Sequence, residues 1–114
     1  MTSAPRDVNV YLDDIITAIT RIETYVEGLN IDQFRADSKT TDAVVRNLEI
    51  IGEAAKKIPD EIRTAHPHIQ WRPAAAMRDF LIHDYPSVDI DAVWNTIKSD
   101  LPVLRTGIEE MRRG

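Results

Sequence analysis

The chain has 114 residues, of which 43% are hydrophobic and 29% are charged, with a net charge of −5 and no cysteine. These values are typical of a globular helical domain, and we expect residues 1–114 to form one such domain. They exclude a disulfide framework and a thiolate metal site. They also disfavour a protein that coats nucleic acid without sequence preference, because such proteins are usually basic.

The N-terminal residues lack the apolar segment of a secretion signal, and no apolar run approaches the roughly 18 residues of a membrane-spanning helix. We therefore expect a cytoplasmic protein, which the absence of cysteine also suits. Residues 1–60 carry a net charge of −4, whereas residues 61–114 carry −1 and contain all three histidines. Any contact with a polyanion would have to be local, or be built from two copies of the more basic side of the molecule.

Hydrophobic spacing predicts a first helix from about Asp7 to Leu29. One face of it repeats at three- and four-residue steps and comprises Leu12, Ile15, Ile19, Ile22, Val26 and Leu29. Gly28 lies near the expected end of this helix. Residues 31–41 are interpreted as a polar connector in which Phe34 packs back against the core.

A second helix is expected to start at Thr41 or Asp42, which are both suitable N-caps, and to end at Ile58. It is unusually apolar, since its main stripe is widened on both flanks and comprises Val44, Val45, Leu48, Ile50, Ile51, Ala54, Ala55 and Ile58. A single core needs a stripe of roughly 100°. The excess indicates either a second copy of the chain or a central place in the bundle. Pro59-Asp60-Glu61 predicts a further short turn.

The remaining segments predict a loop and two more helices. His66-Pro67-His68 forms the loop, and a third helix runs from Pro73, at its first position, to about His83. Pro86 ends it, and Asp89 caps a fourth helix whose buried face comprises Ile90, Val93, Ile97, Leu101, Leu104, Ile108 and Met111. Pro102 predicts a kink or a restart capped by Ser99 or Asp100. The predicted fold is all-α, an up-and-down bundle of four to five helices.

Residues 78–85 read Arg-Asp-Phe-Leu-Ile-His-Asp-Tyr and concentrate the reactive side chains of the chain. RNA can be cleaved without a metal when its own 2′-hydroxyl attacks the adjacent phosphorus. A histidine suits the proton transfers, because imidazole titrates near neutral pH, and a guanidinium suits the phosphate oxygens. Arg78 and His83 are therefore candidate catalytic residues.

Helix geometry limits how these groups can meet. Asp79 and His83 are four residues apart and share a face, so the carboxylate could orient the imidazole. Arg78 and His83 are five apart, about 140° around an ideal helix, so they converge only if the helix unwinds or the substrate bridges them. One site also offers a single histidine where both an acid and a base are needed. A two-fold dimer would supply the second.

A longer resemblance surrounds this motif. Residues 40–56, TTDAVVRNLEIIGEAAK, resemble the second-helix signature of HEPN-domain ribonucleases of the HepT branch. So do Trp71-Arg72 placed before Met77-Arg78-Asp79, and Val93-Trp94 followed by Asp100-Leu101-Pro102. The resemblance extends over roughly residues 8–105 in the same order. It implies a HEPN-like homodimer in which the Arg-x4-His motifs line a cleft between the subunits.

The resemblance also implies an activity and a partner. It makes the chain the toxin of a type II toxin–antitoxin system, a metal-independent endoribonuclease without a cofactor, neutralised by a minimal nucleotidyltransferase antitoxin. It makes Arg78 and His83 the catalytic pair, Asp79 a supporting polar residue and Tyr85 the site that the antitoxin can modify with AMP (AMPylation). Position 84 departs from the pattern, because relatives often have Gly where this chain has Asp84, a carboxylate that would weakly repel RNA.

Other interpretations stay open. The chain could be a non-catalytic helical partner of a nucleotidyltransferase, or a dimeric scaffold without a site. In a purely structural role, Arg78 would form a surface ion pair, His83 would cap a helix and Tyr85 would lie at the edge of the core.

Several residues outside the motif are weaker candidates. His66 and His68 lack an acidic partner and are a poor metal ligand set. Trp71 and Trp94 suit buried anchors better than base stacking. For Glu49 and Glu53, the sequence favours pairing with Arg46 or with the lysines at 56 and 57, or simple solvation.

Overall fold

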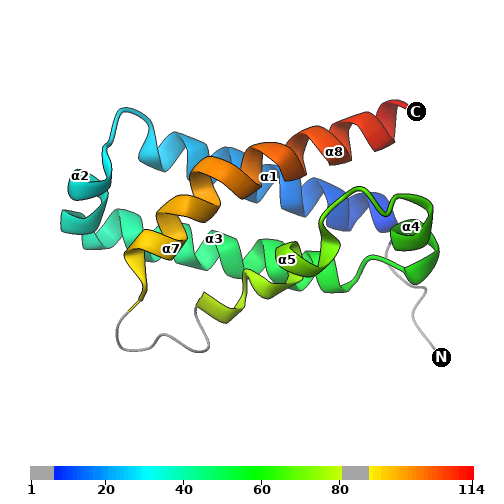
Figure 1. Cartoon of the computed structure of the whole chain (residues 1–114), viewed down its shortest axis with the longest axis horizontal. Helices are drawn as coiled ribbons and strands as arrows, with labels where there is room; N and C mark the ends of the chain where they lie inside the picture. The colour runs from blue at the N-terminus through cyan, green and yellow to red at the C-terminus, as the bar shows by residue number, and fades with distance from the viewer. Residues whose placement is uncertain (1–6, 81–87) are drawn as a thin grey trace.

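The computed structural model describes residues 7–80 and 88–114, and every regular element within them is a helix (Figure 1). The two longest helices, α1 (Val8–Val26) and α3 (Ser38–Lys56), lie side by side and run in opposite directions. The C-terminal helix α8 (Leu101–Arg113) packs along α1. The all-α prediction is confirmed for this part of the chain, and none of its helices is long and apolar enough to cross a membrane.

The first helix begins where the sequence predicts and ends earlier. The Asp7 carboxylate accepts a hydrogen bond of 2.9 Å from the Asn9 backbone N–H and so caps the N-terminus. The predicted face is buried up to Val26, where the helix ends. Gly28 follows with a φ of +78°, a left-handed conformation that glycine adopts without strain. Leu29 therefore lies beyond the helix and not on its last turn.

The expected polar connector contains a further helix, α2 (Ile31–Ala36). Asn30 and Gln33 close it at its start, because each side chain accepts a hydrogen bond from the backbone N–H of the other. Phe34 is fully buried, as predicted. This helix is short and Phe34 is its single buried residue, so hydrophobic spacing does not reveal it.

The second predicted helix starts about four residues earlier than expected. The Asp37 carboxylate caps α3 by accepting a hydrogen bond of 3.1 Å from the Thr40 N–H. The predicted cap at Thr41 or Asp42 is wrong. Thr41 instead lies inside the helix, where its buried hydroxyl donates 3.0 Å hydrogen bonds to the carbonyls of Phe34 and Asp37.

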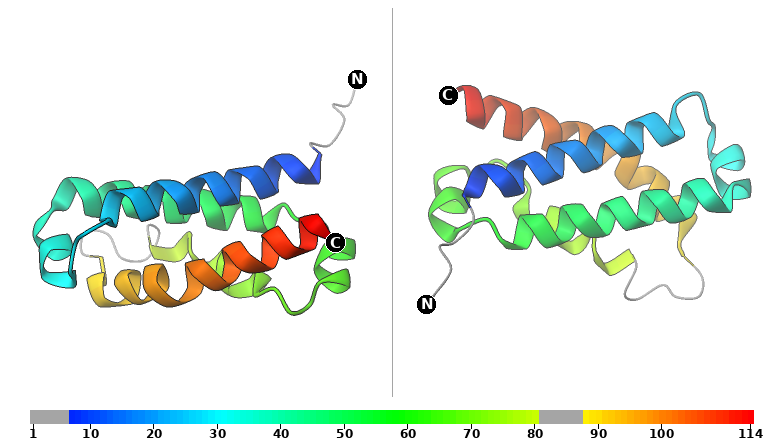
Figure 2. Two further views of the ribbon diagram at one scale, coloured as in Figure 1. Left: turned by 90° about the horizontal axis from the view of Figure 1, so that it is seen from above. Right: turned by 180° about the vertical axis from the view of Figure 1, so that it is seen from behind.

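Helix α3 is the centre of the bundle. It contacts α1 on one side and α5 (Trp71–Ala76) on another, and α2 packs near its start (Figure 2). Val45 and Ala54, which widen its apolar stripe, are buried within a single chain, and Ile50 is half-buried. Its central place explains most of the width of this stripe, and a homodimer remains a proposal.

The segment after α3 forms the short helix α4 (Asp60–Ala65), as Pro59-Asp60-Glu61 predicts. The next helix, α5, starts at Trp71, so Pro73 lies at its third position and not at its first. It ends at Ala76 and is followed by a turn at residues 77 and 78. The prediction of one continuous helix from Pro73 to His83 is therefore wrong at this turn, and His83 and Pro86 lie outside the described residues.

The last helical stretch consists of three consecutive pieces. Asp89 caps α7 (Ile90–Asn95), as predicted, with a hydrogen bond of 3.1 Å from the Ala92 N–H. A π-helical turn, η1 (Thr96–Asp100), follows, and α8 then begins at Leu101 with Pro102 in its first turn. The backbone stays helical from the π-helical turn into α8, so the predicted restart with a side-chain cap does not form. Asp100 occupies the N-cap position, but its side chain forms no capping hydrogen bond.

Candidate functional site

Arg78 lies on the turn that follows α5, directly against the middle of α3. The contact is close because residue 52 is a glycine: a Cβ added there would lie 2.6 Å from the Arg78 backbone nitrogen and 2.9 Å from the Ala75 carbonyl oxygen. Real Cβ atoms do not approach a backbone atom this closely. Gly52 is buried, so the absence of its side chain fixes how near the Arg78 backbone comes to α3.

The Arg78 side chain forms an ion pair with Glu53, the residue that follows Gly52. Its Nη1 donates a hydrogen bond of 2.7 Å to Glu53 Oε1. The Arg78 side chain is 28% exposed and that of Glu53 is 50% exposed, so the pair is partly open to solvent. It corresponds to the surface ion pair that the sequence left open as a structural role for Arg78. It also gives the guanidinium a fixed direction.

A hollow of about 420 Å³ opens beside this turn, and we call it the basic hollow. Four cationic side chains and one carboxylate line it, together with two alanines: Lys56, Arg63, Arg72, Ala75, Ala76, Arg78 and Asp79. The net charge of the whole chain is −5, so this concentration of positive charge is local. In a chain of negative net charge, a polyanion can bind only where positive charge is concentrated locally, and the basic hollow is such a surface.

Arg63 is held rigidly at the wall of the basic hollow. Its Nη2 donates a 2.7 Å hydrogen bond to the Ala55 carbonyl and its Nε donates a 3.0 Å hydrogen bond to the Ile58 carbonyl. These carbonyls belong to the last turn of α3 and to the residues just after it. Arg63 thus satisfies backbone groups that helix geometry leaves open, and its charge is fixed in place before any ligand arrives.

Asp79 follows Arg78, is half-buried and lines the basic hollow. Its predicted neighbour His83 lies outside the described residues, and so do Asp84 and Tyr85. The structure therefore places two of the four predicted site residues, Arg78 and Asp79, at one edge of the basic hollow. Their geometry relative to His83 and Tyr85 stays a prediction.

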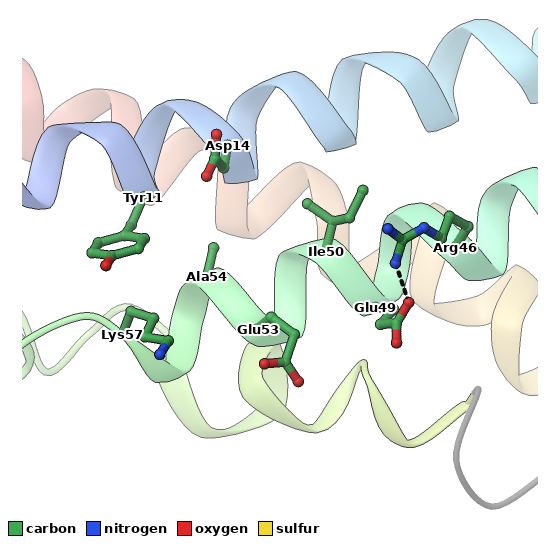
Figure 3. A pocket seen from close by; sticks show the side chains of 8 residues that line it. All are labelled: Tyr11, Asp14, Arg46, Glu49, Ile50, Glu53, Ala54 and Lys57. Atoms are coloured by element: carbon green, nitrogen blue, oxygen red, sulfur yellow. Dashed lines mark hydrogen bonds and ion pairs between the residues drawn. The ribbon is translucent and has the colours of Figure 1, made fainter. Parts of the chain in front are cut away.

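A second hollow, of about 280 Å³, lies on the other side of Glu53, between α1 and α3 (Figure 3). Its lining is of mixed charge and comprises Tyr11, Asp14, Arg46, Glu49, Ile50, Glu53, Ala54 and Lys57. Arg46 forms an ion pair with Glu49, as the sequence favours. Glu53 differs from that prediction, because its partner is Arg78 and neither of the neighbouring lysines.

The two tryptophans that were weaker candidates, Trp71 and Trp94, both pack against neighbouring residues. Trp71 is buried, and its indole N–H donates a 3.1 Å hydrogen bond to the His66 carbonyl. Trp94 is half-buried, with its ring 5.2 Å from that of Phe34 and with Lys98 4.6 Å above it. These contacts agree with the interpretation of both tryptophans as packing anchors.

Comparison with known proteins defines the family. The model of the family described as "Ribonuclease HepT-like" matches residues 15–111, and the chain belongs to this family. A protein of Thermococcus cleftensis named "Probable ribonuclease HepT" is 47% identical over 103 residues, which are 90% of this chain and 94% of the relative. The family predicted from the sequence is confirmed.

Two proteins of Methanocaldococcus jannaschii with "putative RNase" in their names are also similar. One is 39% identical over 93% of this chain and 91% of its own length. The other, whose name begins with gamma-glutamylcyclotransferase, is 42% identical over 90% of this chain, but the match spans only 46% of its own length. No solved structure matches at a significant level.

Sequence reasoning missed the contact of Gly52 with Arg78, the ion pair of Glu53 with Arg78, and the other three cations of the basic hollow. One local signal was available, because a glycine in the interior of a helix lowers its stability and often marks a close backbone approach. The partner of Glu53 had no such signal, since Arg78 is 25 residues further along the chain.

Proposed function

We propose that this chain is a metal-independent endoribonuclease and the toxin component of a type II toxin–antitoxin system. Relatives that match over nearly their whole length carry ribonuclease names. The observation that carries the proposal is the placement of Arg78, which Gly52 and Glu53 hold at the edge of a hollow rich in positive charge. A fixed guanidinium beside a cationic surface suits the binding of a phosphodiester.

The proposed reaction uses the 2′-hydroxyl of the RNA as the nucleophile. The 2′-oxygen forms a bond to the adjacent phosphorus and the bond to the 5′-oxygen breaks, which leaves a 2′,3′-cyclic phosphate and a 5′-hydroxyl. Arg78 binds the non-bridging phosphate oxygens and neutralises the charge that grows on them. A guanidinium has five N–H donors, so it can donate to Glu53 and to a phosphate at the same time.

His83 is assigned the proton transfers, either from the 2′-hydroxyl or to the departing 5′-oxygen. Asp79 is assigned a supporting role, in which its carboxylate orients the imidazole of His83, four residues further along the chain. The reaction needs a base for the 2′-hydroxyl and an acid for the 5′-oxygen at the same time. A homodimer that brings two copies of His83 to one cleft would supply both. The homodimer is part of the proposal.

The proposed partner is a nucleotidyltransferase antitoxin that modifies Tyr85 with AMP. Tyr85 is two residues from His83, so a bulky anion on its hydroxyl would obstruct the cleft and repel the RNA backbone. Cellular RNA is the proposed substrate, and the cytoplasm is the proposed location. In the alternative, the chain is a non-catalytic helical partner of the nucleotidyltransferase.

An RNA cleavage assay in EDTA tests the proposal. It compares the wild-type protein with Arg78→Ala, His83→Ala and the control Arg21→Ala, a change of an exposed arginine on α1. The proposal requires that the wild type and Arg21→Ala cut RNA at equal rates and leave 2′,3′-cyclic phosphate ends. The cleavage rates of Arg78→Ala and His83→Ala should be lower by about 100-fold or more. If no protein cuts, or all cut alike, the non-catalytic alternative replaces it.

A further inference from the structure

The cations of the basic hollow differ in whether they form ion pairs with described carboxylates. Five arginines of the described chain form ion pairs with described carboxylates: Arg35, Arg46, Arg78, Arg105 and Arg112. Lys56 and Arg72 are both exposed, and within residues 7–80 and 88–114 neither forms an ion pair. Their charges are therefore not neutralised by a described neighbour, and they border the same hollow as Arg78.

The basic hollow is large enough to hold part of a ligand. Ala75 and Ala76 form part of its wall, and their small side chains leave open a space of about 420 Å³. This volume lies within the range of roughly 300–1,000 Å³ that is usual for ligand sites. Four cations and one carboxylate line the space. Arg63 is already fixed by its hydrogen bonds to the carbonyls of Ala55 and Ile58. Little ordering of that side chain is then required on binding.

The described residues that line the basic hollow provide charge and no aromatic ring. None of the described lining residues is aromatic, so bases have no ring to stack on there. Lys and Arg are common donors to phosphate oxygens, and contacts to phosphates position a strand without reading its sequence. The expected ligand is therefore a phosphodiester backbone and not a particular base.

We propose that the basic hollow is a binding subsite for the sugar–phosphate backbone of single-stranded RNA, with Lys56 and Arg72 contacting phosphates next to the one held by Arg78. This proposal deepens the proposed ribonuclease function and rests on it for the nature of the ligand. An acidic protein segment is the competing ligand. RNA is favoured because the subsite is continuous with Arg78, the residue assigned to the scissile phosphate.

The test measures binding of a fluorescent 12-nucleotide single-stranded RNA with 2′-O-methyl groups, which prevent cleavage by the 2′-hydroxyl. Fluorescence anisotropy is recorded over a range of salt concentrations for the whole chain and for Lys56→Glu and Arg72→Glu. The matched control is Lys57→Glu, the same charge change at the adjacent residue, which lines the second hollow (Figure 3). Arg21→Glu is the control for the arginine.

Each subsite variant should weaken binding about fivefold to tenfold at low salt and reduce the slope of log K against log salt by about 0.7 to 1. The controls should bind like the wild type. All variants should keep the wild-type circular dichroism spectrum, because the changed side chains are exposed. If Lys56→Glu and Lys57→Glu weaken binding equally, the effect is one of total charge and the subsite is overturned.

Cleavage of an unmodified RNA separates this proposal from the proposed function. A wild type that cuts RNA, with subsite variants that keep its KM and its affinity for the probe, overturns the subsite and leaves the ribonuclease intact. A wild type that does not cut, with subsite variants that lose probe binding, supports the subsite and overturns the ribonuclease. If RNA binding is unchanged and binding of a nucleotidyltransferase is lost, the hollow is a protein-binding surface and the proposal fails.

Discussion

The backbone of Arg78 lies directly on Gly52, so that a Cβ at residue 52 would come within 2.6 Å of the Arg78 nitrogen and 2.8 Å of the Arg78 Cβ. Two segments 26 positions apart in the sequence are thus joined by the absence of a side chain. The neighbouring residue, Glu53, then fixes the direction of the Arg78 guanidinium. The placement of the proposed phosphate-binding arginine depends on both residues.

Replacing Gly52 by Ala should move the turn at Arg78 away from α3. The added methyl meets backbone atoms, which cannot yield as the end of a side chain can, so we expect a loss of about 1–3 kcal/mol in the free energy of unfolding. This loss should exceed the gain of up to about 1 kcal/mol from the better helix propensity of alanine. Urea denaturation measures the net change, and the RNA cleavage rate should fall with it.

Gly107→Ala is the matched control for that change. Gly107 also lies in a helix, α8, but the nearest atom that a Cβ there would meet in another segment belongs to the Ile69 side chain, at 3.0 Å. A side chain can adjust, so this variant should be much closer to the wild type in both measurements. Equal effects of the two changes would contradict the special role of the contact at Arg78.

Replacing Glu53 by Gln should change activity more than stability. The ion pair is partly exposed, so its loss should lower the free energy of unfolding by no more than about 1 kcal/mol. The guanidinium of Arg78 would lose its charged partner and hold its direction less well, and we expect kcat for RNA cleavage to fall about threefold to tenfold. Glu49→Gln serves as the control, because Glu49 pairs with Arg46. A fall in kcat for both variants would argue against a positioning role.

Arg63→Ala should destabilise the chain. Two backbone carbonyls at the end of α3, those of Ala55 and Ile58, would lose their guanidinium donors. Hydrogen bonds from a charged group contribute more than neutral ones, so we expect a loss of about 1–3 kcal/mol in urea denaturation. Arg21→Ala, which removes an exposed arginine from α1, should stay within about 0.5 kcal/mol of the wild type. A wild-type midpoint for Arg63→Ala would show that solvent replaces these bonds without cost.

The Asp37 cap of α3 should make the stability of the folded protein depend on pH at acidic pH. Hydrogen bonds from the Thr40 backbone N–H and from its hydroxyl lower the pKa of Asp37 below its ordinary value of 3.8. The ionised cap therefore contributes stability that is fully present above pH 3.8 and is lost as the pH falls through the lower pKa of the folded state.

Asp37→Asn provides the comparison, because asparagine is an equally good N-cap that does not titrate. The Tm of the wild type relative to that of Asp37→Asn should be constant near neutral pH and should decrease below pH 3.8. A Tm difference that does not change with pH would contradict the assignment of the cap to the Asp37 carboxylate.

The long elements of the fold follow from the sequence, because each buries a repeating face. The stripes from Leu12 to Val26, from Val44 to Ile58 and from Val93 to Ile108 are buried as expected. Hydrophobic spacing does not predict helix α2, because this helix contributes a single buried residue, Phe34. The feature that marks its start is the local pairing of Asn30 with Gln33. The start of α3 was misplaced because several polar residues in a row can cap a helix.

The candidate site was only partly predictable for a different reason. Arg78 and Asp79 stand out by residue type, and their chemistry can be read without a structure. The contacts of Arg78 with Gly52 and Glu53 depend on how α5 packs on α3, which no local pattern contains. The same holds for Lys56 and Arg72, which are ordinary surface residues until the fold brings them to one hollow.

The C-terminal helix closes the bundle through contacts between distant parts of the chain. Arg105 reaches Thr20 and Glu23, and Arg112 reaches Asp13, over separations of 82 to 99 residues. Leu101, Leu104 and Ile108 fill the core beside them. During synthesis from the N-terminus, the part of the apolar face of α1 that packs on α8 therefore stays uncovered until α8 has been made. The segment that carries Arg78 is made before the helix that completes the core.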